Sequence, residues 1–185
     1  CGNGQTWSHN HQRTPKSWTV YLTDWSEGML EDAKFLLKNC MGHYEFEVAD
    51  AQNLNFSDHE FDIVIANHML YLVPDRHQAY REIKRVLKPS GKLLATANGK
   101  DNLHALNDPE LLTLLYPNGN PEQKIFPQEG ERKDLYFTLE SGIVELRKAF
   151  NKVDIIDYPD KLIVSDINDL ICYHKSYVNL SLLQE

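Results

Sequence analysis

A glycine turn and an acidic residue stand at a spacing that suits recognition of a sugar. Gly2, Asn3 and Gly4 form a Gly-Asn-Gly turn, and Asp24 follows Gly4 by 20 residues at the end of the segment TVYLTD. In nucleotide-binding units of this kind, glycine lets the backbone approach the ligand, and the acid accepts hydrogen bonds from ribose hydroxyls. The spacing therefore predicts a ligand that contains a nucleoside.

The third position of the usual dinucleotide fingerprint falls on Trp7. An indole prevents the close approach of helix and strand that glycine or alanine allows there. The turn therefore fits a ligand without a pyrophosphate better. A nicotinamide-dependent oxidoreductase stays an alternative, with Trp7 counting against it.

Polar residues also follow other predicted strands. Asp50, Ala51 and Gln52 come after one strand, and Asn67 and His68 come after another. Because ligands bind outside the carboxyl ends of the strands in an open parallel sheet, we expect these groups to converge with the glycine turn on one ligand.

The elements that must position these residues alternate between strand and helix. Four segments are predicted strands from their apolar patterns, namely 19–23, 44–48, 61–66 and 92–97. The run 61–66 suits a strand buried on both faces. Helices are predicted after Ser26 and after Pro74, and basic residues such as Arg85 complement the dipole at the end of the second helix. This alternation predicts an α/β fold, Rossmann-like and doubly wound, with a mostly parallel sheet.

The second half carries weaker signals. Within residues 98–136 a helix is predicted over 108–115, and the prolines that follow it indicate a mobile excursion over the sheet's carboxyl edge. Helices are predicted at 138–150 and 166–177. Between them, 152–158 and 161–165 are rich in β-branched residues, and their short connection predicts an antiparallel hairpin.

Composition limits the class of protein. The 185 residues predict a single domain over 1–185, and 27 acidic against 19 basic residues, with the basic ones scattered, argue against nucleic acid as a partner. The three cysteines show no CxxC spacing, so neither a zinc site nor a disulfide framework is indicated. We expect no metal, no membrane span and a cytoplasmic location.

Several longer motifs resemble one enzyme family. The segments LTDWSEGML, VADAQNLNFSDHEFDIVIANHMLYLVPD and EIKRVLKPSGKLLATANG are similar to class I S-adenosylmethionine-dependent methyltransferases, in particular the small-molecule branch of ubiquinone and menaquinone biosynthesis. The resemblance covers residue 1 to about residue 173. It implies S-adenosyl-L-methionine as cofactor, a small-molecule methyl acceptor and a sheet of order 3-2-1-4-5-7-6. The first strand would be missing or upstream of the chain, and residues 98–136 would be a lid that selects the substrate.

The resemblance also implies which residues hold the cofactor. The glycine turn would approach its methionine moiety, Asp24 would take both ribose hydroxyls, and Asp50 would accept the adenine amine. Trp25 would cover the adenine ring. The full set implied to bind the cofactor is Gly2, Asn3, Gly4, Asp24, Trp25, Ser26, Met29, Asp50, Ala51, Gln52, Asn67 and His68.

No catalytic residue follows from the sequence. Methyl transfer needs mainly in-line positioning of the acceptor, and a general base helps only where the acceptor must lose a proton. His68 and Tyr71 are the nearest candidates, although such residues more often line a pocket or pack. A non-catalytic module that binds S-adenosylmethionine is therefore a further alternative.

Overall fold

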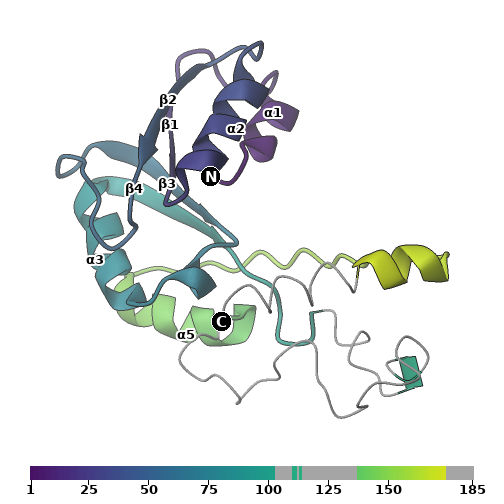
Figure 1. Cartoon of the computed structure of the whole chain (residues 1–185). Helices are drawn as coiled ribbons and strands as arrows, with labels where there is room; N and C mark the ends of the chain where they lie inside the picture. The colour runs from purple at the N-terminus through teal and green to yellow at the C-terminus, as the bar shows by residue number, and fades with distance from the viewer. Residues whose placement is uncertain (103–109, 112, 114–136, 174–185) are drawn as a thin grey trace. The chain divides into compact units, whose positions relative to one another are not determined.

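The computed structural model describes residues 1–102, 110–111, 113 and 137–173 (Figure 1). The chain divides into two compact units, Cys1–Thr96 and Ala97–Glu185. The first unit, which contains every candidate site residue from Gly2 to Tyr71, is described first.

The first part of this unit is a βαβ arrangement preceded by a short helix. Its elements are α1 (Gln5–Asn10), β1 (Thr19–Asp24), α2 (Glu27–Leu37) and β2 (His43–Val48). The strands β1 and β2 are parallel, with Asp24 opposite Val48 at the end of the ladder. The helix α2 buries Leu30, Ala33 and Leu37, and Leu37 packs with Val20 and Leu22 of β1. This confirms the predicted strands at 19–23 and 44–48 and the helix after Ser26.

The second part repeats the arrangement. Its elements are β3 (Phe61–Asn67), the 3-10 turn η1 (Leu70–Leu72), α3 (Arg76–Val86) and β4 (Leu87–Thr96). The strands β3 and β4 are parallel, and α3 buries an apolar stripe that includes Ala79 and Ile83. Strand β4 begins directly after α3, earlier than predicted. The partners in β4 shift from Leu87 opposite Phe61 to Lys92 opposite Ile63, so residues 88–91 form a bulge within the strand.

The two pairs of strands form separate two-stranded sheets, β1–β2 and β3–β4. Three rings link them: Tyr21 of β1 packs edge-to-face on Phe56 and on Phe61 of β3, with ring centroids 5.6 and 5.4 Å apart. The α/β class and the parallel pairing are as predicted. Burial of β3 on both faces is wrong, because Ile63 and Ile65 are 38% and 42% exposed.

The second unit contains α5 (Leu139–Ala149), which confirms the helix predicted at 138–150. Its N-terminus carries a capping box between Thr138 and Ser141. A further helix covers 167–173, within the predicted 166–177. Residues 110, 111 and 113 are helical, within the helix predicted at 108–115, and most of 98–136 lies outside the described residues.

The hairpin expected at 152–165 is absent from the structure. These residues run extended between the two helices of the second unit, without strand pairing (Figure 1). Ile156 and Tyr158 are 89% and 85% exposed. A β-branched sequence becomes a strand only where neighbouring backbone and side chains complete it, and this segment has no such neighbour among the described residues.

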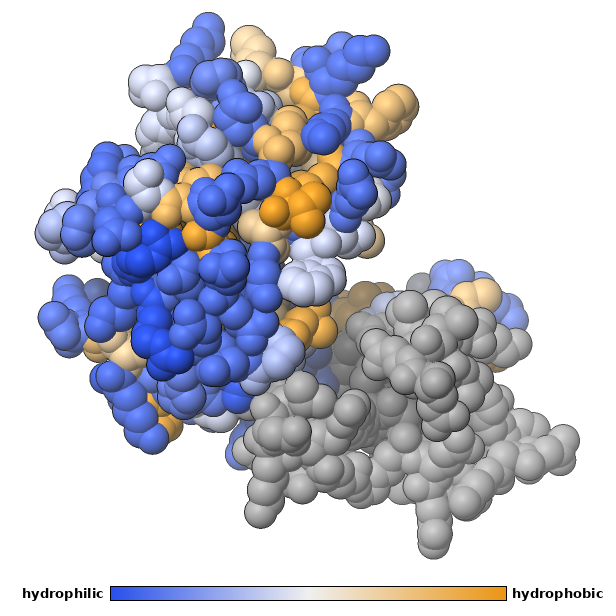
Figure 2. Space-filling model, turned by 60° about the vertical axis from the view of Figure 1, so that its left-hand side comes forward, coloured by the Kyte–Doolittle hydropathy of each residue, from blue (hydrophilic) through white to orange (hydrophobic). Residues whose placement is uncertain are grey.

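The face of the molecule seen in Figure 2 is largely polar. Figure 2 shows hydrophilic side chains over most of the coloured face, with smaller hydrophobic patches between them. Within the described ranges, no helix combines the length and the apolar character that crossing a bilayer requires.

Candidate functional site

One carboxylate joins the glycine turn to the end of β1. The Asp24 Oδ2 accepts the Gly2 N–H at 2.8 Å and the Cys1 amino group at 2.9 Å, while Oδ1 accepts the Ser26 N–H at 3.0 Å. Gly2 has a φ of 57°, in the left-handed region that glycine adopts without a steric cost. The structure thus brings the turn and the acid together, as the spacing implied.

The Asp24 carboxylate is charged at neutral pH. Burial raises its pKa, but hydrogen bonds from Ser26, the Cys1 amino group and Gly2 together bring the pKa below the usual 3.8. An ionised carboxylate offers about four lone-pair positions. The three hydrogen bonds leave Oδ1 able to accept one more donor, such as a hydroxyl.

The two glycines of the turn have different surroundings. A Cβ built on Gly2 meets nothing within 4 Å, so this part of the backbone faces open space. A Cβ built on Gly4, whose φ is 81°, lies 3.0 Å from the Ala33 Cβ and 3.2 Å from its Cα. Gly4 therefore lets the start of α1 pack closely on α2, and Gly2 is the position that a ligand can approach. Asn3 lies between them and its Oδ1 accepts the Gln5 N–H at 3.4 Å.

Apolar surface is available after Asp24. Trp25 is 74% exposed and Met29, in the first turn of α2, is 44% exposed. Ser26 is the N-cap of α2, and its hydroxyl accepts the Met29 N–H at 3.4 Å. Trp25 and Met29 can therefore cover a ligand, whereas the Ser26 hydroxyl is already engaged in capping α2.

The second acidic turn lies at the same edge of the β1–β2 sheet. The Ala49 N–H donates to the Asp24 carbonyl at 3.0 Å, which places Asp50 beside the end of β1. The Asp50 Oδ1 accepts the backbone N–H of Gln52 at 2.8 Å and its amide Nε2 at 3.1 Å. In turn, the Gln52 Oε1 accepts the N–H of Asp75, the N-cap of α3, at 2.9 Å. The Asp50 turn, which includes Ala51, is therefore tied to the helix that follows β3.

Asn67 and His68 are held by the neighbouring strand. The His68 N–H lies 3.2 Å from the Thr96 carbonyl and 3.1 Å from its Oγ1, and the Thr96 hydroxyl is 3.5 Å from the Asn67 Oδ1. His68 has a φ of 47°, which is uncommon for a residue other than glycine and occurs often at functional sites. Tyr71 follows in η1.

Sequence reasoning missed a group on α3. Its position at the end of α3 suits the helix dipole, but the Arg85 guanidinium donates to the Leu54 carbonyl, in the loop after β2, at 2.7 Å and to Glu82 of α3 at 2.8 Å. The available signal was the Glu82–Arg85 spacing of three residues, which puts both on one helix face beside the buried stripe.

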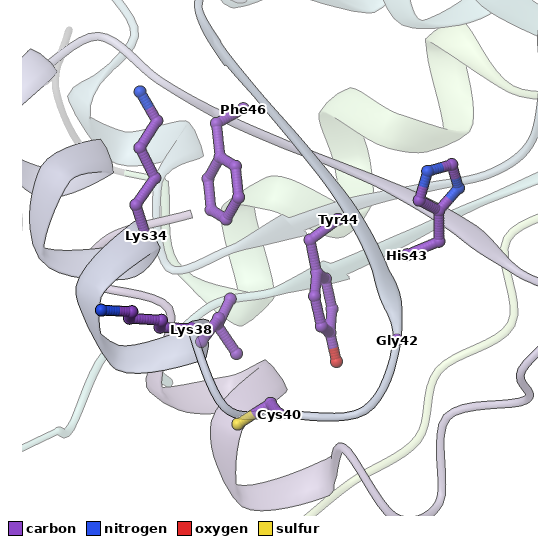
Figure 3. A pocket seen from close by; sticks show the side chains of 8 residues that line it. Lys34, Lys38, Cys40, Gly42, His43, Tyr44 and Phe46 are labelled. Carbon is purple, nitrogen blue, oxygen red and sulfur yellow. The ribbon is translucent and has the colours of Figure 1, made fainter.

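A shallow hollow of about 250 Å³ lies at the opposite end of β2 (Figure 3). It is lined by Lys34, Leu37, Lys38, Cys40, Gly42, His43, Tyr44 and Phe46. His43 begins β2 whereas Asp50 follows its end, so this hollow is separate from the acidic turns. The lysines stand in and just after the last turn of α2, where basic residues suit the helix dipole.

Comparison with known sequences gives consistent matches. A family model described as "Methyltransferase domain" matches residues 1–95, almost the whole first unit. A demethylmenaquinone methyltransferase of Lactobacillus johnsonii is 35% identical over 95 residues, which are 50% of this chain and 39% of that protein. The ubiquinone/menaquinone biosynthesis C-methyltransferase UbiE of Cronobacter sakazakii is 32% identical over 108 residues, 57% of this chain and 43% of that protein. The chain thus spans about two fifths of these relatives.

A solved structure shares the fold. The SAM-dependent methyltransferase of Methanosarcina mazei aligns with a TM-score of 0.55 and 22% identity, over 80% of this chain and 75% of that one. At this identity the likeness concerns the Rossmann-like α/β architecture alone.

Proposed function

This chain belongs to the methyltransferase domain family, and we propose that it transfers a methyl group from S-adenosyl-L-methionine to a small-molecule acceptor. The observation that carries the proposal is the ionised Asp24 carboxylate, which stands between the open Gly2 backbone and the Asp50 turn. The names of the relatives support a methyltransferase and give no support to a nicotinamide-dependent oxidoreductase.

The residues present fit the cofactor. In the present conformation, Oδ1 of Asp24 can accept a hydrogen bond from one ribose hydroxyl. To accept hydrogen bonds from both hydroxyls, the carboxylate must lose its hydrogen bond to one backbone N–H. The exposed Trp25 and Met29 offer apolar surface for the adenine and ribose. Asp50 would accept the adenine amine, and the backbone of Ala51 and Gln52 would meet the ring.

The remaining residues would serve the amino acid end of the cofactor. Gly2, Asn3 and Gly4 would shape its approach, and Asn67 and His68 would face it from the end of β3. When bound, the cofactor supplies a methyl group made electrophilic by a positively charged sulfur. The chain's own task would be to orient the acceptor in line with that group and to exclude water.

A general base is a separate part of the proposal. His68 and Tyr71 are the candidates, because both lie in the loop after β3. If His68 accepts a proton from the acceptor, His68→Asn should lower kcat even when S-adenosylmethionine is saturating, so that any loss of cofactor affinity does not account for the effect. An unchanged kcat would remove His68 from this role.

The arrangement of the family sheet also belongs to the proposal. We assign β2, β1, β3 and β4 to positions 3, 2, 4 and 5 of the order 3-2-1-4-5-7-6, which agrees with the β1–β2 and β3–β4 pairings. Residues 98–136 would act as a lid that selects the acceptor, and the enzyme would work in the cytoplasm.

Calorimetry with S-adenosylmethionine and S-adenosylhomocysteine tests the cofactor directly. The full-length protein should bind both, and the absence of binding to either would overturn the proposal. Transfer of labelled methyl to an acceptor then separates an enzyme from a non-catalytic binding module. Demethylmenaquinone is the first acceptor to try, because the name of one relative refers to it and the name of the other refers to ubiquinone/menaquinone biosynthesis.

A further inference from the structure

Arg85, near the end of α3, binds the loop that joins β2 to β3. Its guanidinium donates to the carbonyls of Leu54 at 2.7 Å and Phe56 at 2.6 Å, and to the Asp58 carboxylate at 2.9 Å. A guanidinium presents several donors in one rigid plane, so it holds these three acceptors in a defined relative position. The ammonium of a lysine could not reproduce that geometry.

Glu82 completes the connection. Its carboxylate accepts from Arg85 Nε at 2.9 Å and Nη2 at 2.8 Å, and it also accepts the Leu54 N–H at 2.8 Å. Leu54 is therefore bound to α3 through both of its backbone groups. The hydrogen bond from Arg85 is the main reason that the pKa of Glu82 lies below its usual 4.5, against burial, which raises it.

Leu54 directly follows the turn that contains Asp50. Within that turn the Asn53 N–H donates to the Asp50 carbonyl at 2.9 Å. The turn is also held by the 2.9 Å bond from the Asp75 N–H to the Gln52 Oε1. Helix α3 thus holds this segment at two points, at Gln52 through the N-cap and at Leu54 through the Glu82–Arg85 pair.

We propose that Arg85 is a positioning residue, which acts through Glu82 and Leu54 to set the Asp50–Gln52 turn for recognition of the adenine amine. The inference rests on the proposed function and deepens it. Arg85 itself would not touch the cofactor. Its effect would be on selectivity, because displacement of a hydrogen-bonding group by about 1 Å is enough to lose a directional contact.

The test compares two ligands that differ at the base. S-adenosylhomocysteine carries the exocyclic amine, and S-inosylhomocysteine carries an oxygen in its place. Calorimetry of the full-length protein gives the ratio of their Kd values for the wild type, Arg85→Lys and Arg85→Met. The matched control is Lys88→Met, which removes the 2.8 Å ion pair between Lys88 and Asp62 and leaves the loop bonds intact. Circular dichroism selects a temperature at which every variant is folded.

We expect the wild type to prefer the adenosyl ligand, the Arg85 variants to lower that preference at least about fivefold, and Lys88→Met to keep it within about twofold. If the Arg85 variants leave the ratio of the two Kd values unchanged, whether both affinities fall equally or neither falls, the positioning role is overturned. The proposed function would still stand. If the wild type binds neither ligand, the proposed function fails and this inference fails with it. If Arg85→Met does not fold, Glu82→Gln takes its place, because it weakens the hold on Leu54 while preserving side-chain shape.

Discussion

The Gly2 N–H donates to the Asp24 Oδ2 at 2.8 Å, across 22 positions of the chain. The proposed ribose-binding carboxylate is therefore also the anchor of the glycine turn. Loss of this side chain should affect the ligand and the conformation of the turn together.

Asp24→Asn tests this double role. The amide keeps the shape of the side chain but loses the charge and one acceptor, and hydrogen bonds to charged groups contribute about 1.5–3 kcal/mol. We expect the Kd for S-adenosylhomocysteine to rise about 10- to 150-fold in calorimetry. Asp62→Asn, at an exposed ion pair, is the control and should stay within about twofold. Equal affinity of Asp24→Asn and the wild type would contradict the proposed contact.

The two glycines of the turn should respond differently to alanine. Gly4→Ala places a methyl group 3.0 Å from the Ala33 Cβ, so we expect it to lower the free energy of unfolding by about 1–3 kcal/mol. Gly2→Ala meets no neighbour and should cost about 1 kcal/mol, from its positive φ alone. Urea unfolding measures both. The double variant Gly4→Ala/Ala33→Gly should cost less than the sum of its parts, and strict additivity would show that the close contact is unimportant.

Acid should weaken the loop held by α3. The pKa of Glu82 is lowered by the Arg85 hydrogen bond, against burial, and further by the Leu54 N–H. Because the folded pKa is below the unfolded value of 4.5, this stabilisation is full above that pH and is lost as the pH falls through the folded pKa. We expect the stability difference between wild type and Glu82→Gln to be constant from about pH 7 to about pH 5 and to shrink below that range. Urea unfolding at stepped pH measures it, and a difference that persists in strong acid would refute the assignment.

The backbone at His68 should tolerate glycine better than a β-branched residue. His68 has a φ of 47° and its N–H is held by Thr96, and a β-branched side chain is strained at such a φ. We expect His68→Val to lower the free energy of unfolding by about 1–2 kcal/mol and His68→Gly to leave it near or above that of the wild type. Thermal unfolding ranks the variants. A valine variant as stable as the glycine one would mean that the loop relaxes freely.

Local signals in the sequence are sufficient for β1, α2, β2, β3 and α3 of the first unit. The Ser26 cap and the apolar spacing of Leu30, Ala33 and Leu37 depend on neighbours within one helix, so they can be recognised without a fold. The same holds for Asp24 and Asp50, because a polar residue after an apolar strand marks the strand's carboxyl end.

Features that depend on residues distant in the sequence cannot be predicted from these local signals. Arg85 stands among other basic residues, and only the path of the loop after β2 decides that its guanidinium meets Leu54 and Phe56. The hairpin prediction at 152–165 is wrong for the same reason. A segment forms a strand only when another strand pairs with it, and β propensity alone does not indicate whether such a partner exists. The bulge at Pro89 depends on the register between β3 and β4.

The separation of β1–β2 from β3–β4 has a practical consequence for handling the protein. Among the described residues, each sheet has two strands, so each presents backbone N–H and C=O groups along its outer sides, next to exposed side chains such as Ile65 and Leu94. Such edges recruit strands from other molecules. The light scattered per unit mass of purified protein should therefore rise with its concentration, and short peptides that copy β3 should reduce that rise by pairing with the exposed edges.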